Sequence, residues 1–385
     1  MASLCVKVDK IRAQDAKMAL LEHDLLDEDR EPLHEGNSIY FAVLDGSEPE
    51  VKSILNVEFQ FVTGKCPPSR KHRKGNLATL LSNVIPRDLA ALIPRAFNII
   101  GEIAILELSE QLAGYKNVIA EKLRELHPSL KAVYVKRSER AGEFRTSELD
   151  LAWGQDDPVT THAENECKFR VDVKNAFFDP RLTHEHARII DIVTDRARER
   201  GTLDVLDLFC GVGPFVIPLA KNPGVRSWAV DLNPRAIELL EANLKLNKID
   251  PARVKCHAMD AKEFLERPDL DSRPPRLFDA IILNLPRKAH EFLQACHGRA
   301  RPGTILFWYT IAQDFFDGKF MAGKPPVALI ETLHGLEKSS EENEINELCP
   351  RGLEIVQEMG YAIKQITRVK PFSPYKYIYC FELQP

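Results

Sequence analysis

The second half of the chain alternates short apolar runs with amphipathic helical segments. Mostly apolar runs stand at 203–208, 278–283 and 304–310, and a further strand is expected at 254–258. Runs without polar alternation predict parallel strands, because helices cover both faces of a parallel sheet. A helical pattern at 181–200 precedes the first run, and two extended runs, 362–369 and 375–383, end the chain around a proline-containing turn. We therefore expect an α/β domain that finishes with an antiparallel pair of strands.

The first half of the chain mixes short helical and extended patterns. A helical pattern at 13–25, followed by extended runs at 38–44 and 57–62, predicts a small α+β module over residues 1–64. Helical and extended patterns at 77–83, 97–106, 109–126, 132–135 and 168–173 predict a second α+β domain over 76–175. The Pro-Pro and basic segment 65–75 is predicted to link these two domains, and 176–385 is predicted to form the third.

Composition places the chain among ordinary globular proteins. Its 385 residues are 44% hydrophobic and 28% charged, which suits two or three packed domains. No signal-peptide profile and no apolar run of membrane-spanning length occurs, so we expect a cytoplasmic protein without a membrane partner. The eight cysteines form no C-x-x-C pair, and we expect neither a metal site nor a disulfide framework.

The charge distribution bears on the partner. The net charge of −5 argues weakly against nucleic acid, but the sum hides basic clusters at 65–75, 136–145 and 368–376. Each cluster has two interpretations, a solvated face or a surface that lies along phosphates.

A glycine turn follows the run at 203–208. Gly211 and Gly213 stand between that predicted strand and a helix, where the lack of side chains lets a nucleotide-like ligand approach the backbone. A dinucleotide fingerprint would need a third glycine at position 216, where this chain has Val, so NAD is disfavoured. Asp231 follows about twenty residues later, at a distance suited to accept hydrogen bonds from ribose hydroxyls.

Polar residues end four predicted strands in series, namely Asp207, Asp231, Asp260 and Asn284. Ligands of open parallel sheets bind at the carboxyl ends of the strands, so the series predicts one crevice. The pattern resembles a class I S-adenosylmethionine-dependent methyltransferase, in which a final antiparallel pair is typical. The alternative is a doubly wound domain whose acidic residues cap helices.

Longer motifs narrow this resemblance. They are Phe177-Phe178-Asp179-Pro180-Arg181-Leu182-Thr183-His184-Glu185, Glu164-Asn165, Phe169-Arg170-Val171-Asp172, Asn284-Leu285-Pro286 and Phe144-Arg145. Together they resemble the archaeal and eukaryotic tRNA (guanine-37 N1)-methyltransferase family over nearly the full chain. The resemblance implies a Rossmann-like class I methyltransferase domain at the C-terminus, preceded by two smaller α+β domains. It also implies S-adenosylmethionine as cofactor and tRNA as partner. We expect a monomer.

The resemblance assigns roles to individual residues. Glu185 would take the proton from guanine N1, while Arg145 and Asn284 would stabilise the charge that develops on O6. Phe177 and Pro286 would contact the extruded base. The cofactor would bind at Arg181, Asp207, Phe209, Cys210, Gly211, Gly213, Asp231, Leu232, Asp260, Asn284 and Pro286.

Other interpretations of these residues stay open. Without the resemblance, Glu185 would be a helix-start carboxylate favoured by the macrodipole, and Arg145 a surface cation. His184 and His186 are expected to be solvated. Asp179 and His186 depart from the family, which often has Ser and Arg at these two positions. The alternative functions are aminocarboxypropyl transfer to, or methylation of, a wybutosine-pathway base, and a non-catalytic cofactor-binding RNA chaperone.

Overall fold

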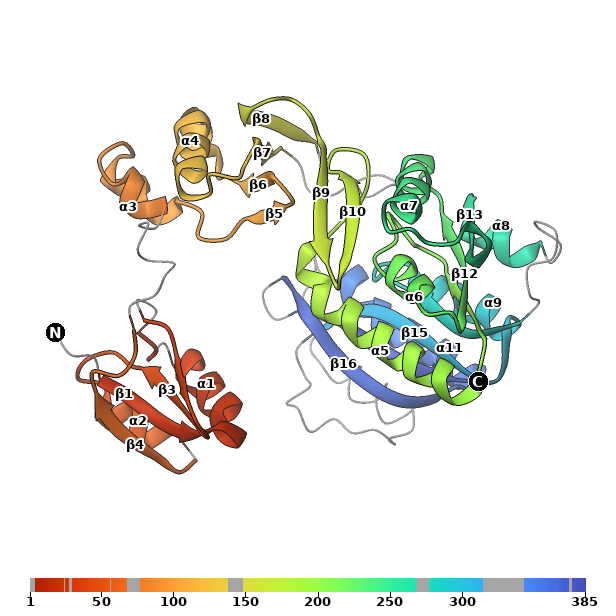
Figure 1. Cartoon of the computed structure of the whole chain (residues 1–385), viewed down its shortest axis with the longest axis horizontal. Coiled ribbons are helices and arrows are strands. Elements are labelled where there is room, and N and C mark those ends of the chain that lie inside the picture. Colours follow the sequence, from red (N-terminus) through yellow and green to blue (C-terminus); the bar gives the residue numbers. More distant parts are fainter. Residues whose placement is uncertain are drawn as a thin grey trace. The chain divides into compact units, whose positions relative to one another are not determined.

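The computed structural model describes residues 4–23, 25–27, 30–55, 57–67, 77–137, 148–267, 277–313, 343–373 and 376–385. These residues form two compact units, one from residues 1–96 and 108–129 and the other from 97–107 and 130–385 (Figure 1). Among the described residues, no helix combines the length and the apolar character that a membrane crossing requires.

The first unit contains a four-stranded antiparallel sheet in the order β2-β3-β1-β4. Its elements are β1 Leu4–Asp9, α1 Ala13–Glu22, β2 Leu33–Glu35, β3 Ser38–Ala42, α2 Glu48–Ile54 and β4 Phe59–Thr63. Val6 and Phe41 from the sheet pack with Leu20 of α1 and Val51 of α2 in one apolar core. The predicted helix and the two predicted strands are present, whereas β1 was not predicted.

The remainder of the first unit is helical. It comprises α3 Leu77–Leu81, η3 Arg87–Leu92, η4 Glu110–Tyr115 and α4 Lys116–Leu126. The helix predicted over 109–126 therefore begins with a 3-10 segment and becomes an α-helix from Lys116 onward.

The second unit begins with two small sheets. The first has the order β5-β6-β7-β8, and the second is the antiparallel hairpin β9-β10. Their strands are β5 Asn98–Ile100, β6 Ile103–Glu107, β7 Ala132–Lys136, β8 Leu149–Gly154, β9 Val159–Glu164 and β10 Cys167–Asp172. Sequence patterns predicted β7 and most of β10 but neither β8 nor β9.

A seven-stranded sheet dominates the second unit, in the order β13-β12-β11-β14-β15-β17-β16. The first five strands are parallel, and β17 pairs antiparallel with both β15 and β16. The strands are β11 Leu203–Asp207, β12 Val225–Asp231, β13 Val254–Ala258, β14 Phe278–Leu283, β15 Ala300–Gln313, β16 Ala362–Ser373 and β17 Lys376–Gln384. This order is the expected Rossmann-like methyltransferase arrangement, with the predicted antiparallel ending.

Helices cover both faces of the large sheet (Figure 1). They are η5 Pro180–Leu182, α5 Thr183–Arg200, α6 Val216–Lys221, α7 Pro234–Leu246, η6 Pro251–Arg253, α8 Ala261–Glu266, η7 Ala289–Phe292, α9 Leu293–His297 and α11 Asn343–Glu358. Alternate residues of β11 show the two layers, since Val205 packs with Ile189 of α5 while Leu206 belongs to the core that includes Phe264 of α8. Both faces of β11 are thus buried, as its mostly apolar sequence predicted.

Candidate functional site

The glycine turn joins β11 to α6 in a conformation that its sequence requires. Gly211 and Gly213 have φ angles of +53° and +94°, in the left-handed region that favours glycine. A Cβ atom on Gly213 would lie 2.5 Å from Cδ1 of Leu240 in α7, whereas one on Gly211 would meet only the carbonyl oxygen of Phe177 at 3.5 Å. The turn therefore keeps backbone, rather than side chains, at the carboxyl end of β11.

Asp231 fastens this turn to the end of β12. Its Oδ2 accepts a hydrogen bond from the Gly211 amide at 2.7 Å, and its Oδ1 accepts one from the Asn233 amide at 2.9 Å. Burial raises the pKa of Asp231, although the two amides act in the opposite direction. Leu232, which follows it, is half-buried. The predicted ribose-binding carboxylate thus also positions the glycine turn.

Asp207 is a buried carboxylate with few hydrogen-bond partners. Its Oδ1 accepts a hydrogen bond from the Phe209 amide at 3.3 Å, while Oδ2 has no hydrogen-bond partner among the described residues. Burial raises the pKa of Asp207 to about 8, and the nearby charge of Asp231 adds to this. A buried acceptor without a partner is costly, so this edge favours a ligand that brings a donor or a positive charge.

The other predicted cofactor residues lie at the same ends of the strands. Phe209 packs edge-on against Phe292, with ring centroids 5.1 Å apart. Asp260 caps α8 by accepting hydrogen bonds from the Lys262 and Glu263 amides at 2.7 and 3.2 Å. Cys210 and Pro286 are buried. Helix capping, the alternative interpretation of the acidic residues, therefore accounts for the contacts of Asp260, whereas those of Asp207 require another explanation.

Glu185 lies in the first turn of α5, with its side chain only 6% exposed. Arg188, one turn later, donates from Nη2 to Oε1 and from Nε to Oε2, both at 2.8 Å. The hydroxyl of Tyr309 on β15 also donates to Oε1, at 2.7 Å. The carboxylate is therefore fixed toward the sheet rather than directed into solvent.

Strand register places this carboxylate near the end of β14. Leu283, the last residue of β14, pairs with Trp308 of β15. Asn284 follows Leu283 and Tyr309 follows Trp308. Tyr309, which binds Glu185, is therefore level with Asn284, which is predicted to stabilise the charge on O6. Asn284 itself is half-buried. The structure thus brings the surroundings of Glu185 and Asn284 to one edge of the sheet.

His186 has an environment that the sequence did not predict. It is 2% exposed, and its Nδ1 lies 2.8 Å from Oε1 of Glu164, at the end of β9. Its ring packs edge-on against Phe215 at 4.8 Å. Thr183 donates to the other oxygen of Glu164 at 2.6 Å. The expectation of a solvated His186 is wrong, because this side chain joins the hairpin to the start of α5, whereas His184 is exposed.

Arg181 and Phe177 flank the start of α5. Arg181 donates from Nε and Nη2 to Asp179, both at 2.9 Å, and its side chain remains 57% exposed. Lys370 of β16 also binds Asp179. Burial opposes the charge of Asp179, but these two cations outweigh it and lower its pKa. Phe177 is half-buried, and its backbone lies beside the glycine turn.

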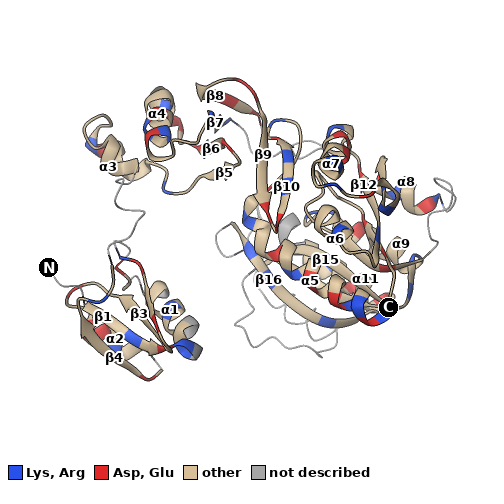
Figure 2. Ribbon diagram, in the orientation of Figure 1, with Lys and Arg blue, Asp and Glu red and all other residues tan. Residues whose placement is uncertain are grey.

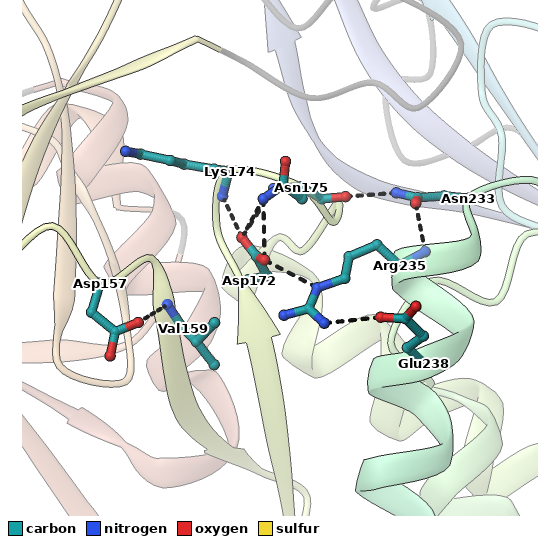
Figure 3. Close-up of polar contacts among 8 residues, drawn as sticks. All are labelled: Asp157, Val159, Asp172, Lys174, Asn175, Asn233, Arg235 and Glu238. Atoms are coloured by element: carbon teal, nitrogen blue, oxygen red, sulfur yellow. Dashed lines mark hydrogen bonds and ion pairs between the residues drawn. The ribbon is translucent and has the colours of Figure 1, made fainter.

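A polar network ties the segment that carries Phe177 to the start of α7 (Figure 3). Asp172, at the end of β10, accepts hydrogen bonds from the backbone and side-chain amides of Asn175 and, at 3.1 Å, from Nε of Arg235. Asn233 donates to the carbonyl oxygen of Asn175 at 2.6 Å and caps α7. Because Asn233 also binds Asp231, the network links the predicted substrate side to the predicted cofactor side.

The hairpin β9-β10 is bound to α7 by a buried amide. Asn243 is 0% exposed; it accepts from the amide of Arg170 at 2.6 Å and donates to the carbonyl oxygen of Val212 at 3.0 Å. Asn247 makes similar bonds to the backbone of Lys168. The hairpin and the glycine turn therefore share one hydrogen-bonded side chain.

Several predicted features lie outside the described residues. They are Phe144, Arg145 and all of the basic segment 65–75 after residue 67. Within the described residues, Lys and Arg are interspersed with Asp and Glu in both units (Figure 2), and no group of His, Cys, Asp or Glu side chains is arranged to hold a metal ion. All eight cysteines are free thiols.

Arg188, Tyr309 and Glu382 contribute to the site but were not predicted. The spacing of Glu185 and Arg188 is a signal that sequence reasoning could have used, because residues three apart on a helix are neighbours. Tyr309 and Glu382 reach the site through strand pairing between β15 and β17, which no local pattern encodes.

Comparison with protein families divides the chain into three matched regions. Residues 160–326 match the model of the TRM5/TYW2 methyltransferase domain. Residues 5–51 match the tRNA methyltransferase 5 N-terminal domain, and residues 77–157 match the TYW2 N-terminal domain.

Curated relatives match most of the chain. The tRNA (guanine(37)-N(1))-methyltransferase Trm5b of Methanocaldococcus jannaschii is 33% identical over 314 residues, which cover 81% of this chain and 88% of the relative. Trm5b of Pyrococcus abyssi is 34% identical over 307 residues, covering 80% and 84% of the two chains.

Solved structures agree with these relatives. The crystal structure of Trm5b from Pyrococcus abyssi is 29% identical, with a TM-score of 0.61 over 99% of both chains. A complex of aTrm5 with tRNALeu is 28% identical, with the same TM-score and coverage. From its sequence identity to these enzymes over most of its length, the chain belongs to the Trm5 family of tRNA (guanine(37)-N(1))-methyltransferases.

Proposed function

We propose that this protein transfers a methyl group from S-adenosylmethionine to N1 of guanosine 37 in tRNA. The single observation that carries the proposal is the identity to Trm5b enzymes over four-fifths of the chain. The solved complex of a related aTrm5 with tRNALeu supports tRNA as the partner. We further propose that the protein binds RNA as a monomer in the cytoplasm.

The carboxyl edge of the sheet suits this cofactor. Asp207 and Asp231 are buried carboxylates that accept hydrogen bonds from backbone amides, and Oδ2 of Asp207 is unsatisfied among the described residues. Such carboxylates favour a ligand with hydroxyl donors and positive charge, both of which S-adenosylmethionine has. We propose that these two residues, with Gly211, Gly213 and the other predicted residues of this edge, hold it. When bound, it supplies an electron-poor methyl group on a sulfonium.

Glu185 is the proposed general base. Guanine N1 is a weak acid and becomes a competent nucleophile only as its proton leaves, so a carboxylate beside it accelerates the transfer. Negative charge then spreads to O6, where Asn284 and Arg145 are proposed to stabilise it. Phe177 and Pro286 are proposed to pack against the extruded base, since N1 lies on the Watson–Crick edge and cannot be reached in a stacked pair.

A labelling experiment tests the reaction. We expect label from the donor methyl group to enter tRNA with G at position 37, and none to enter tRNA with A there. Transfer of label from the aminobutyrate part would instead establish the aminocarboxypropyl reaction. Binding of the donor and tRNA without any transfer would leave a cofactor-binding chaperone.

A substitution tests the base. Glu185→Gln keeps the size of the side chain but removes its proton acceptor, so we expect the single-turnover methylation rate to fall by about 10²- to 10⁴-fold. Donor affinity, measured by calorimetry, should stay within about twofold. Glu199→Gln is the matched control, because Glu199 is exposed in the last turn of the same helix. An unchanged rate in Glu185→Gln would refute the assignment.

A further inference from the structure

Glu185 faces charged and titratable groups on three elements. Arg188 is on its own helix, Tyr309 is on β15, and Cys380 and Glu382 are on β17. Strand pairing explains this convergence, because Tyr309 pairs with Cys380 and Phe307 pairs with Glu382. These residues form a buried polar cluster within an otherwise apolar layer beneath α5.

Arg188 is shared between two carboxylates. It donates from Nε and Nη2 to Glu185 and from Nη1 to Glu382, whose side chain is 10% exposed. Burial disfavours the guanidinium charge, but the hydrogen bonds to both carboxylates outweigh burial and raise the pKa of Arg188. The cation therefore persists throughout the pH range of an enzyme assay.

Tyr309 and Cys380 are neutral members of this cluster. Burial raises the pKa of both groups well above their ordinary values. Tyr309 thus remains a hydroxyl that donates to Oε1 of Glu185. A hydrogen bond donated to a carboxylate favours its ionised form.

Glu382 has the opposite effect to Tyr309, because its negative charge disfavours the ionised form of Glu185. With Arg188 and Glu185 alone, protonation of Glu185 would leave an uncompensated cation in a buried site, which is costly. With Glu382 present, the cluster changes from a net charge of −1 to neutral when Glu185 takes up a proton. The second carboxylate therefore makes proton uptake by Glu185 easier.

We infer that Tyr309 and Glu382 are positioning residues that set the basicity of Glu185, Tyr309 making it a weaker base and Glu382 a stronger one. The inference rests on the proposed role of Glu185. Oε1 already accepts two donors and Oε2 only one, so Oε2 is the oxygen that receives the proton of guanine N1. The N1 lone pair released by this transfer forms the bond to the methyl group, whose former bonding pair stays on sulfur.

The test is the pH dependence of single-turnover methylation between pH 5 and 9. We expect Tyr309→Phe to move the acidic limb of the pH–rate profile, where the rate falls as pH falls, to higher pH by about one unit. The reason is the loss of a hydrogen bond that favours the carboxylate. Glu382→Gln should move the acidic limb to lower pH by a similar amount, because a negative charge close to Glu185 is lost. Glu382→Asp keeps the charge and should restore the wild-type limb.

Two controls separate this tuning from a loss of packing. Tyr361→Phe removes a buried hydroxyl that binds the carbonyl oxygen of Leu293, in the core on the opposite face of the sheet. Asp204→Asn removes a buried carboxylate that binds Arg226, at the amino end of β11. Neither control should move the limb.

The outcomes distinguish the inference from the function on which it rests. Displacement of the acidic limb in opposite directions in the two variants supports the inference. If Glu382→Gln does not fold, the direction of the displacement in Tyr309→Phe alone tests it. A limb that stays fixed or moves downward in Tyr309→Phe, while wild type is active and Glu185→Gln is not, overturns the inference alone. Absence of methyl transfer by wild type, or full activity of Glu185→Gln, refutes the proposed function or base and the inference with it.

Discussion

Buried carboxylates on the two sides of the candidate site have opposite surroundings. Asp207 and Asp231, at the ends of β11 and β12, accept hydrogen bonds from backbone amides and, in the described part of the chain, form no ion pair with a side-chain cation. Glu164 and Asp179, on the hairpin side, are bound by His186 and by Arg181 with Lys370. Within the described residues, Asp207 and Asp231 therefore have no side-chain cation to pair with, whereas Glu164 and Asp179 are paired with basic side chains.

The contrast extends to proton affinity. Burial raises the pKa of Asp207 to about 8. Burial acts the same way on Glu164, but the nearby His162 and the hydrogen bonds with His186 and Thr183 outweigh it and lower the pKa of Glu164 to about 2. The carboxylates on the hairpin side are thus paired within the protein, whereas the charge of Asp207 would be compensated by a ligand that carries positive charge.

The largest expected effect on stability is on the hairpin side, where the carboxylates are paired. Glu164→Gln removes one partner of a buried pair and should lower the free energy of unfolding by about 3–5 kcal/mol, as measured by urea denaturation. Glu238→Gln is the control, because Glu238 pairs with Arg235 at the surface and should contribute little. Equal losses in the two variants would contradict the contrast between the buried pair and the exposed one.

A smaller effect is expected at the glycine turn. Gly213→Ala places a Cβ against Leu240 at a positive φ and should cost about 2–3 kcal/mol in the same measurement. Gly211→Ala meets no close atom and should cost about 1 kcal/mol, the price of its φ alone. If Gly211→Ala proved the more damaging to stability, packing against α7 would not be the main constraint on the turn.

A third effect is a dependence of the free energy of unfolding on pH. The pKa of Asp207 is raised on folding, so its contribution to stability is complete below about pH 4 and declines as pH rises toward 8, by about 1.4 kcal/mol per pH unit. Asp207→Asn should lack this decline in urea unfolding measured from pH 5 to 8. Saturating S-adenosylmethionine should flatten the wild-type slope, because a bound cation favours the ionised form. Parallel slopes for wild type and variant would show that Asp207 is already ionised.

Glu164 should give a slope of the opposite sign at lower pH. Its pKa is lowered on folding, so the stability it contributes is present above about pH 4.5 and is lost as pH falls toward 2. The two windows overlap only near pH 4, and the two sides of the site can therefore be followed separately in one titration.

Local patterns predicted the elements of the large sheet well. The ranges 254–258 and 278–283 coincide with β13 and β14, and 278–283 is the nearly continuous apolar run expected of a buried parallel strand. The hairpin strand β9 was missed because its sequence, Val-Thr-Thr-His-Ala-Glu, has few apolar positions and gains its order from packing in the second unit. Domain boundaries at 64, 76 and 176 stay predictions.

The contacts of the site were less predictable than its residues. Glu185, Asn284 and the acidic strand ends were identified by motif and spacing. The bonds from Tyr309 to Glu185 and from Arg188 to Glu382 join residues 124 and 194 positions apart, and such distant pairs depend on the complete fold. His186 was placed in solvent because its flanking residues are polar, while its actual partners, Glu164 and Phe215, come from other elements.

The buried amide of Asn243 has a consequence for motion. Since one buried side chain binds both the Arg170 backbone and the Val212 carbonyl, opening either segment alone would leave part of this amide unpaired, which favours opening of the two together. Thermal fluctuations that expose the backbone of the glycine turn should therefore disrupt the hairpin as well, and we expect the two segments to exchange their amide hydrogens as one cooperative unit.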